Sequence, residues 1–396
     1  MKHKLFIFAL LATVGFFNPM GVLSDQVQKL LFYISVLFCF IVANNSNISL
    51  QRYDYPRKSY TVLLLGIIIS IFMASAFHMQ SFKTSIVATL PFIFSFSFFY
   101  ALMKLNIQSD KILKIYAIVC LLSSIVYFTN LITFPNPVFG GEIDEDLSRG
   151  MQRIPVKFLE VFVLLLLYSI NSWLIEKKKK WIYYIVILSV MIILSVTRQV
   201  ILYAGVLSVI FIFKDISYFK KFLLCASIVI VVVYVLPLIP IYNEMVELSE
   251  MQAAENEDED NIRIQAWRYY TDENQTNNVT RLFGNGVPSL GNSMWGQMFD
   301  SETEDNGCYY ADVSWAGFYY LFGIFSTCAL LILLIKAMMK KKKANKRYLT
   351  YWFAFMILYG IAAGPFVYFY QIFNLMIGLY LVYTPDEDSN SNIKLQ

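Results

Sequence analysis

Apolar residues fall along this chain in long runs that short polar connections separate. Most runs have the length of about 18–25 residues that a helix needs to cross about 30 Å of hydrocarbon. Because lipid offers backbone groups no hydrogen-bond partners, each run is expected to be a helix. About twelve spans are predicted, at residues 5–23, 29–43, 60–78, 84–103, 113–133, 156–175, 181–197, 199–213, 220–240, 312–335, 349–364 and 366–383.

The composition excludes an ordinary soluble domain. Of the 396 residues, 58% are hydrophobic, 17% are aromatic and only 15% are charged, whereas a soluble domain is about 25% charged. The five cysteines show no paired spacing, so neither a disulfide framework nor a metal site is predicted. The sequence therefore predicts an all-α polytopic membrane protein, whose first hydrophobic segment is retained as a helix rather than cleaved as a signal peptide.

The positions of the basic residues predict the orientation of the spans. The connections alternate between two sets, and one set holds 23 of the 32 Lys and Arg residues, including the runs Lys177–Lys180 and Lys340–Lys343. Loops rich in Lys and Arg stay in the cytoplasm. This set is therefore predicted to be cytoplasmic, together with both chain termini.

One predicted outward connection is much longer than the others. It covers residues 241–311, opens with an acidic stretch and continues with arginines and aromatic residues. It divides the chain into an N-terminal membrane domain of about nine helices (1–240), the external loop, and about three C-terminal helices (312–384). The polar tail (385–396) is expected to be disordered and cytoplasmic.

Arg198 lies between two apolar runs, in the segment ILSVTRQVILYAG, on the side where arginine is disfavoured. An ionisable residue at membrane depth usually lines a cavity or meets a partner. Its planar guanidinium suits a pair of anionic oxygens, such as those of a diphosphate or a carboxylate. The alternative is an arginine that extends to the outer headgroups.

A second group of candidate residues lies in the large loop. Arg263 and Trp267 are four residues apart and share one face of a predicted helix, and Arg268 follows them. The alternative for these arginines is pairing with the preceding acidic residues. Arg281 precedes the turn LFGNGVPSLG, which by itself predicts only a flexible loop.

Asp312 begins the predicted tenth span, in YYADVSWAGFYYLFGIF. A carboxylate at the outer interface can accept a proton from a sugar hydroxyl, and Asp is also a common helix N-cap. Arg149 and Arg153, before the sixth span, are expected to extend an outward basic patch. Glu160, at the start of that span, is a second carboxyl within an apolar run, whereas His78 is expected to be an ordinary interfacial residue.

Three segments resemble the O-antigen polymerase and O-antigen ligase family of bacterial envelope glycosyltransferases. SVTRQVILYAG resembles the family's Ser/Thr-Arg segment at an outward helix end, and RIQAWRYY followed by LFGNGVPSLG resembles the Arg-x-x-x-Trp helix and Gly-x-Gly turn of its large loop. DVSWAGFYYLFGIF keeps the glycine pattern of the loop exit, with Gly317 and Gly323. Ligases carry a histidine near this exit, where Asp312 is the nearest candidate here, so the resemblance favours a polymerase.

The resemblance implies a GT-C-like glycosyltransferase that works without metal or cofactor on the outer face of the bacterial inner membrane. Its donor would be a glycan on undecaprenyl diphosphate, and its acceptor a sugar hydroxyl on a second lipid-linked repeat unit of an O-antigen, capsule or exopolysaccharide. Arg198 and Arg263 would neutralise the diphosphate, and Asp312 would take the acceptor proton. Substrate contacts would come from further arginines and aromatic residues: Arg153, Arg268, Arg281, Trp267, Tyr269, Tyr270 and Trp295.

The implied partners are the lipid-linked glycan, the bilayer, a chain-length regulator and a flippase, with no nucleic acid. A structural or sensory membrane protein without catalysis would not need Arg198 at membrane depth. Two other functions stay open. One is an O-antigen ligase, which transfers the finished glycan to a lipid or protein acceptor. The other is a polysaccharide flippase or transporter, which the single long outward loop and the scarcity of charges inside the spans disfavour.

Overall fold

The computed structural model describes residues 25–46, 53–133, 158–195, 197–215, 262–275 and 277–385, with a few isolated positions besides. Every regular element within these ranges is a helix. Most of the predicted first span, the whole ninth span, Arg149, Arg153 and the acidic stretch of the large loop lie outside the described residues.

Ten of the predicted spans lie in the described residues, and each of them holds one helix. Five of these helices, α3 to α6 and α14, are long and apolar enough to cross a membrane, and shorter apolar helices accompany them. These findings support an all-helical polytopic membrane protein, whereas the number twelve stays a prediction. The ten helices are α2 (Asp25–Asn44), α3 (Arg57–His78), α4 (Phe82–Leu105), α5 (Ser109–Ile132), α6 (Leu159–Glu176), α7 (Lys180–Leu194), α8 (Arg198–Asp215), α14 (Ser314–Met339), α15 (Tyr348–Tyr359) and α16 (Phe369–Tyr383).

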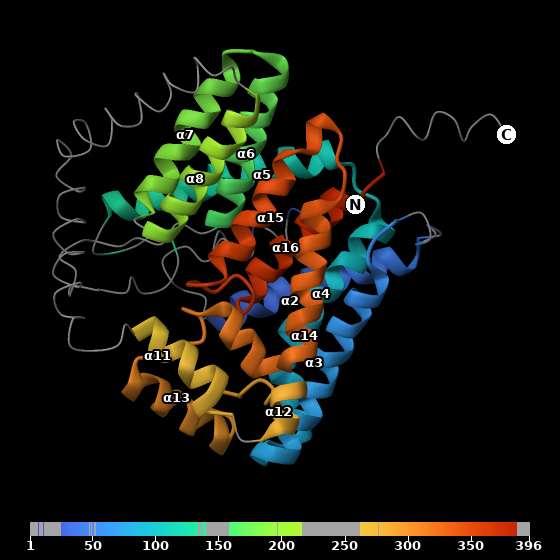
Figure 1. The fold of residues 1–396 in the computed structure, drawn as a ribbon, viewed down its shortest axis with the longest axis vertical. Coiled ribbons are helices and arrows are strands. Elements are labelled where there is room, and N and C mark those ends of the chain that lie inside the picture. The colour runs from blue at the N-terminus through green and yellow to red at the C-terminus, as the bar shows by residue number, and fades with distance from the viewer. Residues whose placement is uncertain are drawn as a thin grey trace.

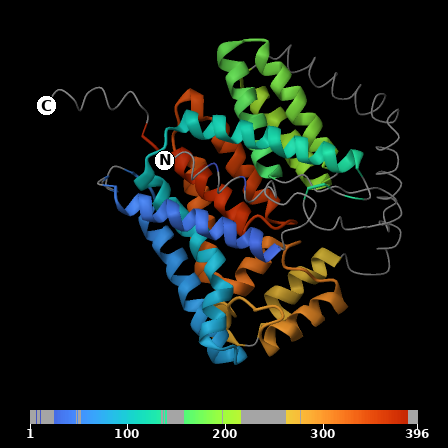
Figure 2. The ribbon, with the colours of Figure 1, turned by 180° about the vertical axis from the view of Figure 1, so that it is seen from behind.

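The helices form two groups, which meet where α14 packs against α15 and where α16 packs between α4 and α6. In one group α3 packs against α4 and α14, and α2 covers α4; in the other, α6 packs against α7, α8 and α15. Figure 1 shows the two groups with α5 beside α6, and Figure 2 shows α2 and α5 from behind. Every residue of α16 from Gln371 to Tyr383 is buried, because this helix packs against α4 on one side and α6 on the other.

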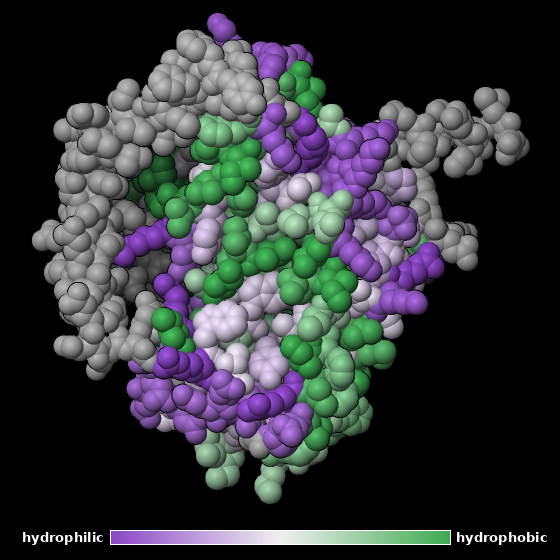
Figure 3. Space-filling view, in the orientation of Figure 1, coloured by the Kyte–Doolittle hydropathy of each residue, from purple (hydrophilic) through white to green (hydrophobic). Residues whose placement is uncertain are grey.

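The basic connections of the predicted cytoplasmic set gather at one end of the bundle. Lys340 Nζ donates to the carbonyl oxygen of Asp54 at 2.9 Å, and Asn171 Nδ2, near the end of α6, donates to that of Ala344 at 3.0 Å. We call this the lysine-rich end; it carries the α6–α7 and α14–α15 connections. Figure 3 shows hydrophilic residues toward both ends of the molecule, with hydrophobic residues between them. The alternation that the charges predict is therefore present in the described part of the chain.

The described part of the large loop forms short helices at the opposite end, which we call the loop end (Figure 1). The predicted helix around Arg263 and Trp267 is confirmed as α11, and it continues into a π-helical turn, η5. Because α12 packs against α14 and α3, this part of the loop is docked on the membrane helices. Its elements are α11 (Ile262–Arg268), η5 (Tyr269–Glu273), α12 (Asn278–Phe283) and α13 (Met294–Asn306).

α15 and α16 are shorter than the two spans predicted in this region. With 12 and 15 residues they are about 18 and 22 Å long, less than the hydrocarbon thickness of about 30 Å. Between them lies Gly360–Tyr368, which we call the floor segment. It meets the start of α14, since the backbone N–H of Ser314 donates to the carbonyl oxygen of Ala363 at 3.1 Å and that of Trp315 donates to Gly360 at 3.1 Å.

α14 is not the single straight helix that the span predicted at 312–335 implied. Gly323 has φ 74° and ψ 175°, and it divides the element into two helical parts. Only glycine adopts this backbone conformation without strain. The chain changes direction at Gly323, so that the first part of α14 turns back toward the floor segment (Figure 1).

Candidate functional site

The Gly-x-Gly turn of the loop is buried against the break in α14. Gly284 and Gly286 have φ of 85° and 88°, a region that favours glycine. The backbone N–H of Asn285 donates to the carbonyl oxygen of Tyr320 at 2.9 Å, and that of Gly286 donates to Leu321 at 3.0 Å. These carbonyls are available because the break in α14 removes their helical partners. The prediction of a flexible loop at this turn is therefore wrong, because the turn is buried against α14.

Two polar residues at the end of α3 complete this contact. Nε2 of His78 lies 3.0 Å from Oδ1 of Asn285, and its ring stacks on Trp295 with centroids 4.0 Å apart. Gln80 is 2% exposed, and its side chain makes four hydrogen bonds, three of which reach the loop segment 287–293. His78 and Gln80 thus fasten the loop to α3. Gln80 is not among the residues predicted from the sequence. The only sequence signal for it is its position just after an apolar span.

Asp312 is exposed in the turn that leads into α14. The N-cap of α14 is Val313, and no side chain caps this helix, so the N-cap role considered for Asp312 is wrong. The Asp312 carboxylate is close enough to act electrostatically on Tyr368, the last residue of the floor segment. Burial first, and then the negative charge of Asp312, raise the pKa of the Tyr368 phenol above its ordinary value. The floor segment therefore has a carboxylate at its border.

α11 is fixed to the floor segment through Trp267. The indole Nε1–H donates to the carbonyl oxygen of Ile361 at 3.1 Å. Arg263 lies one turn earlier on the same face of the helix, and both Arg263 and Arg268 are exposed. Arg263 is therefore one helical turn from the residue that contacts the floor segment.

The tyrosines that follow α11 face into the loop. Tyr270 is fully buried, and its hydroxyl donates to the carbonyl oxygen of Cys308 at 2.6 Å. The hydroxyl of Tyr269 donates to Glu302 at 2.9 Å. Burial raises the pKa of the Tyr270 phenol and of the Cys308 thiol above their ordinary values. Because its ring is enclosed, Tyr270 supports the loop and presents no face on which a sugar could stack.

Arg198 begins α8 and is exposed. α8 runs antiparallel to α15, because Phe211 and Lys214 near its end both lie over Tyr351, near the start of α15. Arg198 precedes Phe211 by 13 residues, and Gly360 follows Tyr351 by nine, which are about 20 and 14 Å along the two helices. Arg198 therefore lies toward the end of α15 from which the floor segment leaves.

Arg281 does not join this group. It lies on α12, where its guanidinium is 3.9 Å from the carboxylate of Asp272 and both side chains are exposed. Arg153 lies outside the described residues. Of the predicted residues, Trp267 and Asp312 therefore border the floor segment. Arg263 lies on the same helix face as Trp267, and Arg198 begins α8.

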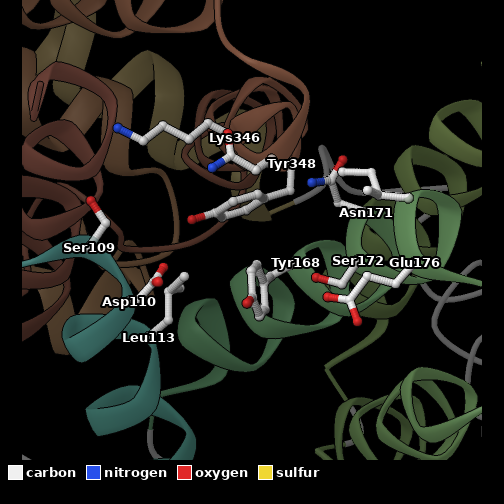
Figure 4. Close-up of a pocket in the computed structure, with 11 residues that line it drawn as sticks. Ser109, Asp110, Leu113, Tyr168, Asn171, Ser172, Glu176, Lys346 and Tyr348 are labelled. Carbon is white, nitrogen blue, oxygen red and sulfur yellow. The ribbon is translucent and has the colours of Figure 1, made fainter. Parts of the chain in front are cut away.

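A cavity of about 130 Å³ lies at the lysine-rich end, between the start of α5, the end of α6 and the start of α15. Figure 4 shows the charged side chains Asp110, Glu176 and Lys346 around it, with the phenols of Tyr168 and Tyr348 between them. None of the predicted functional residues lines this cavity. We therefore take the loop end as the candidate functional site.

The side chains around the floor segment offer a carboxylate, guanidinium groups and an indole. A carboxylate can accept a proton from a hydroxyl, and guanidinium groups bind pairs of anionic oxygens. Within the described residues, no group of three His, Cys, Asp or Glu side chains is placed to hold a metal ion. The site therefore suits a substrate that carries both hydroxyl and anionic groups.

No protein-family model matches this chain, and no curated protein matches its sequence significantly. The family resemblance of the three short motifs therefore stays an expectation. A functional assignment depends on those motifs and on the geometry of the loop end.

Proposed function

We propose that the chain is a polysaccharide polymerase of the bacterial inner membrane, with a GT-C-like glycosyltransferase architecture of about twelve spans. It joins undecaprenyl-diphosphate-linked repeat units into O-antigen, capsule or exopolysaccharide. The observation that carries the proposal is that Trp267 and Asp312, from opposite ends of the described loop, border the same floor segment at the loop end.

The proposed reaction is a single glycosyl transfer. The oxygen of an acceptor sugar hydroxyl bonds to the anomeric carbon of the donor glycan, while the bond from that carbon to the diphosphate oxygen breaks. The diphosphate leaves with the bonding electron pair, and Arg198 and Arg263 stabilise the negative charge that develops on it. Asp312 accepts the proton of the acceptor hydroxyl.

The docked loop supports this arrangement. The buried turn Gly284–Gly286 holds the loop against α3 and α14, and Trp267 ties α11 to the floor segment. In the proposal the diphosphate of the lipid-linked donor sits at headgroup level on the outer face, and the lysine-rich end faces the cytoplasm. A flippase then supplies the lipid-linked units, and a chain-length regulator acts as a further partner.

Deletion of the gene tests the proposal in the cell. Surface polysaccharide separated on a gel should lose its ladder and show single repeat units attached to the core. A ligase deletion would instead leave no units attached and would accumulate lipid-linked polymer. An unchanged ladder would contradict both enzyme assignments.

Complementation of the deletion tests the site itself. Arg198→Ala and Arg263→Ala, expressed to normal levels, should fail to restore the ladder, because the leaving diphosphate would keep its full charge. Arg281→Ala is the matched control, since Arg281 is an exposed arginine of the same loop that faces Asp272. Restoration of a normal ladder by both test variants would refute the proposed diphosphate site.

A further inference from the structure

A second carboxyl group lies inside the bundle, and the proposed reaction does not use it. Glu160, in the first turn of α6, is 1% exposed. Its Oε1 accepts a hydrogen bond from Nδ2 of Asn374 at 2.7 Å, whereas its Oε2 is buried without a hydrogen-bond partner in the described part of the chain. An ionisable residue at such depth is costly in a membrane protein, and it usually marks a function.

Glu160 and Asn374 together connect four helices. Asn374 on α16 accepts, through Oδ1, a hydrogen bond from the hydroxyl of Tyr116 on α5 at 3.0 Å. The indole Nε1–H of Trp352 on α15 donates to the backbone carbonyl of Glu160 at 2.9 Å. Helices α5, α6, α15 and α16 are therefore joined through Glu160 and Asn374 together.

This junction lies beneath the floor segment. Asn374 follows Tyr368 by six residues, which is about 9 Å along α16. Trp352 precedes Gly360 by eight residues, which is about 12 Å along α15. The two helices that carry the floor segment are thus tied together about two turns below it.

The surroundings of Glu160 favour its protonated form. Within the described residues, the titratable groups that interact electrostatically with it are Tyr116 and Cys120 from α5 and Tyr370 from α16, and none of them is a cation. A buried carboxylate without a cation is strongly disfavoured, whereas a neutral acid whose carbonyl accepts a hydrogen bond is tolerated. With Oε1 bound to Asn374, the proton lies on Oε2.

We propose that protonated Glu160 is a positioning residue of the site, which ties α6 to α16 through Asn374 and so holds the floor segment beside Asp312. Glu160 itself does not touch the substrate. The effect of Glu160 on catalysis rests on the proposed function. Its protonation and its hydrogen bond with Asn374 do not depend on that function.

The proposal fixes the sign of a pH effect. Because the folded protein accommodates the protonated acid and not the carboxylate, folding favours proton binding. The stabilising contribution of Glu160 is therefore fully present only below about pH 4.3, where the carboxyl is protonated in the unfolded chain too. It falls as the pH rises from there, until the folded protein also loses the proton. Ionisation would place an uncompensated negative charge where the four helices meet.

Two variants separate the effect of the proton on Glu160 from the effect of its hydrogen bond with Asn374. Glu160→Gln keeps a carbonyl oxygen for Asn374 and cannot ionise, whereas Glu160→Ala removes the acceptor. In detergent, E160Q and the wild type should unfold at similar temperatures near about pH 4, and the wild type should fall below E160Q as the pH rises to neutral and alkaline values. E160A should unfold at a lower temperature throughout. The matched control is Glu176→Gln, an exposed glutamate at the other end of the same helix, which should follow the wild type.

Infrared spectroscopy at neutral and alkaline pH detects the proton directly. Wild type and E176Q should show the C=O stretch of a buried protonated carboxylic acid at neutral pH, and E160Q should lack that band. Absence of the band from the wild type, or its persistence in E160Q, would overturn the proposal. An E160Q protein that unfolds as readily as E160A would also overturn it, because the tie would then not depend on the carbonyl oxygen.

An activity measurement on purified protein with lipid-linked repeat units tests the positioning role. In E160A, kcat should fall by about tenfold or more with little change in KM, since a displaced floor segment misplaces the reacting groups. E160Q should restore kcat. If E160Q is folded and as inactive as E160A, positioning through the tie is refuted. If the wild type itself forms no polymer, the proposed function fails, while the infrared and unfolding results still decide the state of Glu160.

Discussion

The large loop meets the membrane helices at two contacts of different kinds. At the glycine contact, the backbone of Gly284–Gly286 packs against the backbone of Tyr320–Gly323. All these residues are buried. At the floor contact, Trp267 and Asp312 border Gly360–Tyr368. There one indole hydrogen bond reaches the segment, and the nearby charged side chains stay exposed.

This difference separates the parts that hold the loop from the parts that carry chemistry. The glycine contact has no room for an added atom, since a Cβ at Gly284 would meet the carbonyl oxygen of Leu321. The floor contact keeps polar groups accessible, as a binding site on a scaffold requires. Changes at the glycine contact should therefore act on stability, and changes at the floor contact should act on activity.

The largest loss of stability is expected for Gly284→Ala. Its φ of 85° and ψ of 165° belong to a region that only glycine occupies readily, and the new Cβ would meet backbone atoms of α14. The free energy of unfolding should fall by about 3–5 kcal/mol. Denaturant unfolding of the detergent-solubilised protein measures this change.

Gly291→Ala is the control for that substitution. Gly291 also has a positive φ, of 75°, but no atom lies within 4 Å of the position that its Cβ would take. Its cost should be limited to a backbone term of about 1–2 kcal/mol. Equal losses at Gly284 and Gly291 would show that packing against α14 contributes nothing to the loop's attachment.

An intermediate effect is expected for Tyr270→Phe. The substitution removes the hydroxyl that donates to the carbonyl oxygen of Cys308 at 2.6 Å and leaves the ring in place. Loss of this buried hydrogen bond should lower the free energy of unfolding by about 1–2 kcal/mol, and the polysaccharide ladder should be retained. A variant as stable as the wild type but unable to form a ladder would instead assign Tyr270 to the substrate site.

The smallest effect is expected for Arg281→Ala. Its guanidinium is 3.9 Å from Asp272, and both side chains are exposed, so the ion pair should contribute about 0.5 kcal/mol or less. Unfolding at low and high salt should give nearly the same difference from the wild type. A loss greater than about 1 kcal/mol would mean that this arginine holds the docked loop.

The layout of the helices was predictable because lipid imposes it. A span must be long and apolar, so the runs in the sequence mark the helices that the structure describes, and the charge alternation marks which connections share an end. The break in α14 was not predictable, because the apolar pattern continues through it. The break at Gly323 lies where the loop backbone at Leu282 and Gly284 packs closely against α14, and the sequence around Gly323 does not show this contact.

The candidate site was predictable only in part. Arg198 and Asp312 stand out because charged residues at the edges of apolar runs are costly. The inward orientation of Tyr270 follows from the π-helical turn, which shifts the faces of a helix and leaves no clear mark in the sequence. The tie between Glu160 and Asn374 joins residues 214 positions apart, and no local pattern pairs them.

The central claim, that the chemistry takes place at the floor segment, is tested most directly by polymer formation with purified Asp312→Asn and lipid-linked repeat units. Asparagine keeps the size of the side chain and removes its basicity, and Glu304→Gln, at an exposed carboxylate of α13, is the control. The account predicts that D312N unfolds at the wild-type temperature and loses about 100-fold or more in rate, while E304Q keeps its rate. A wild-type rate in D312N would contradict the account.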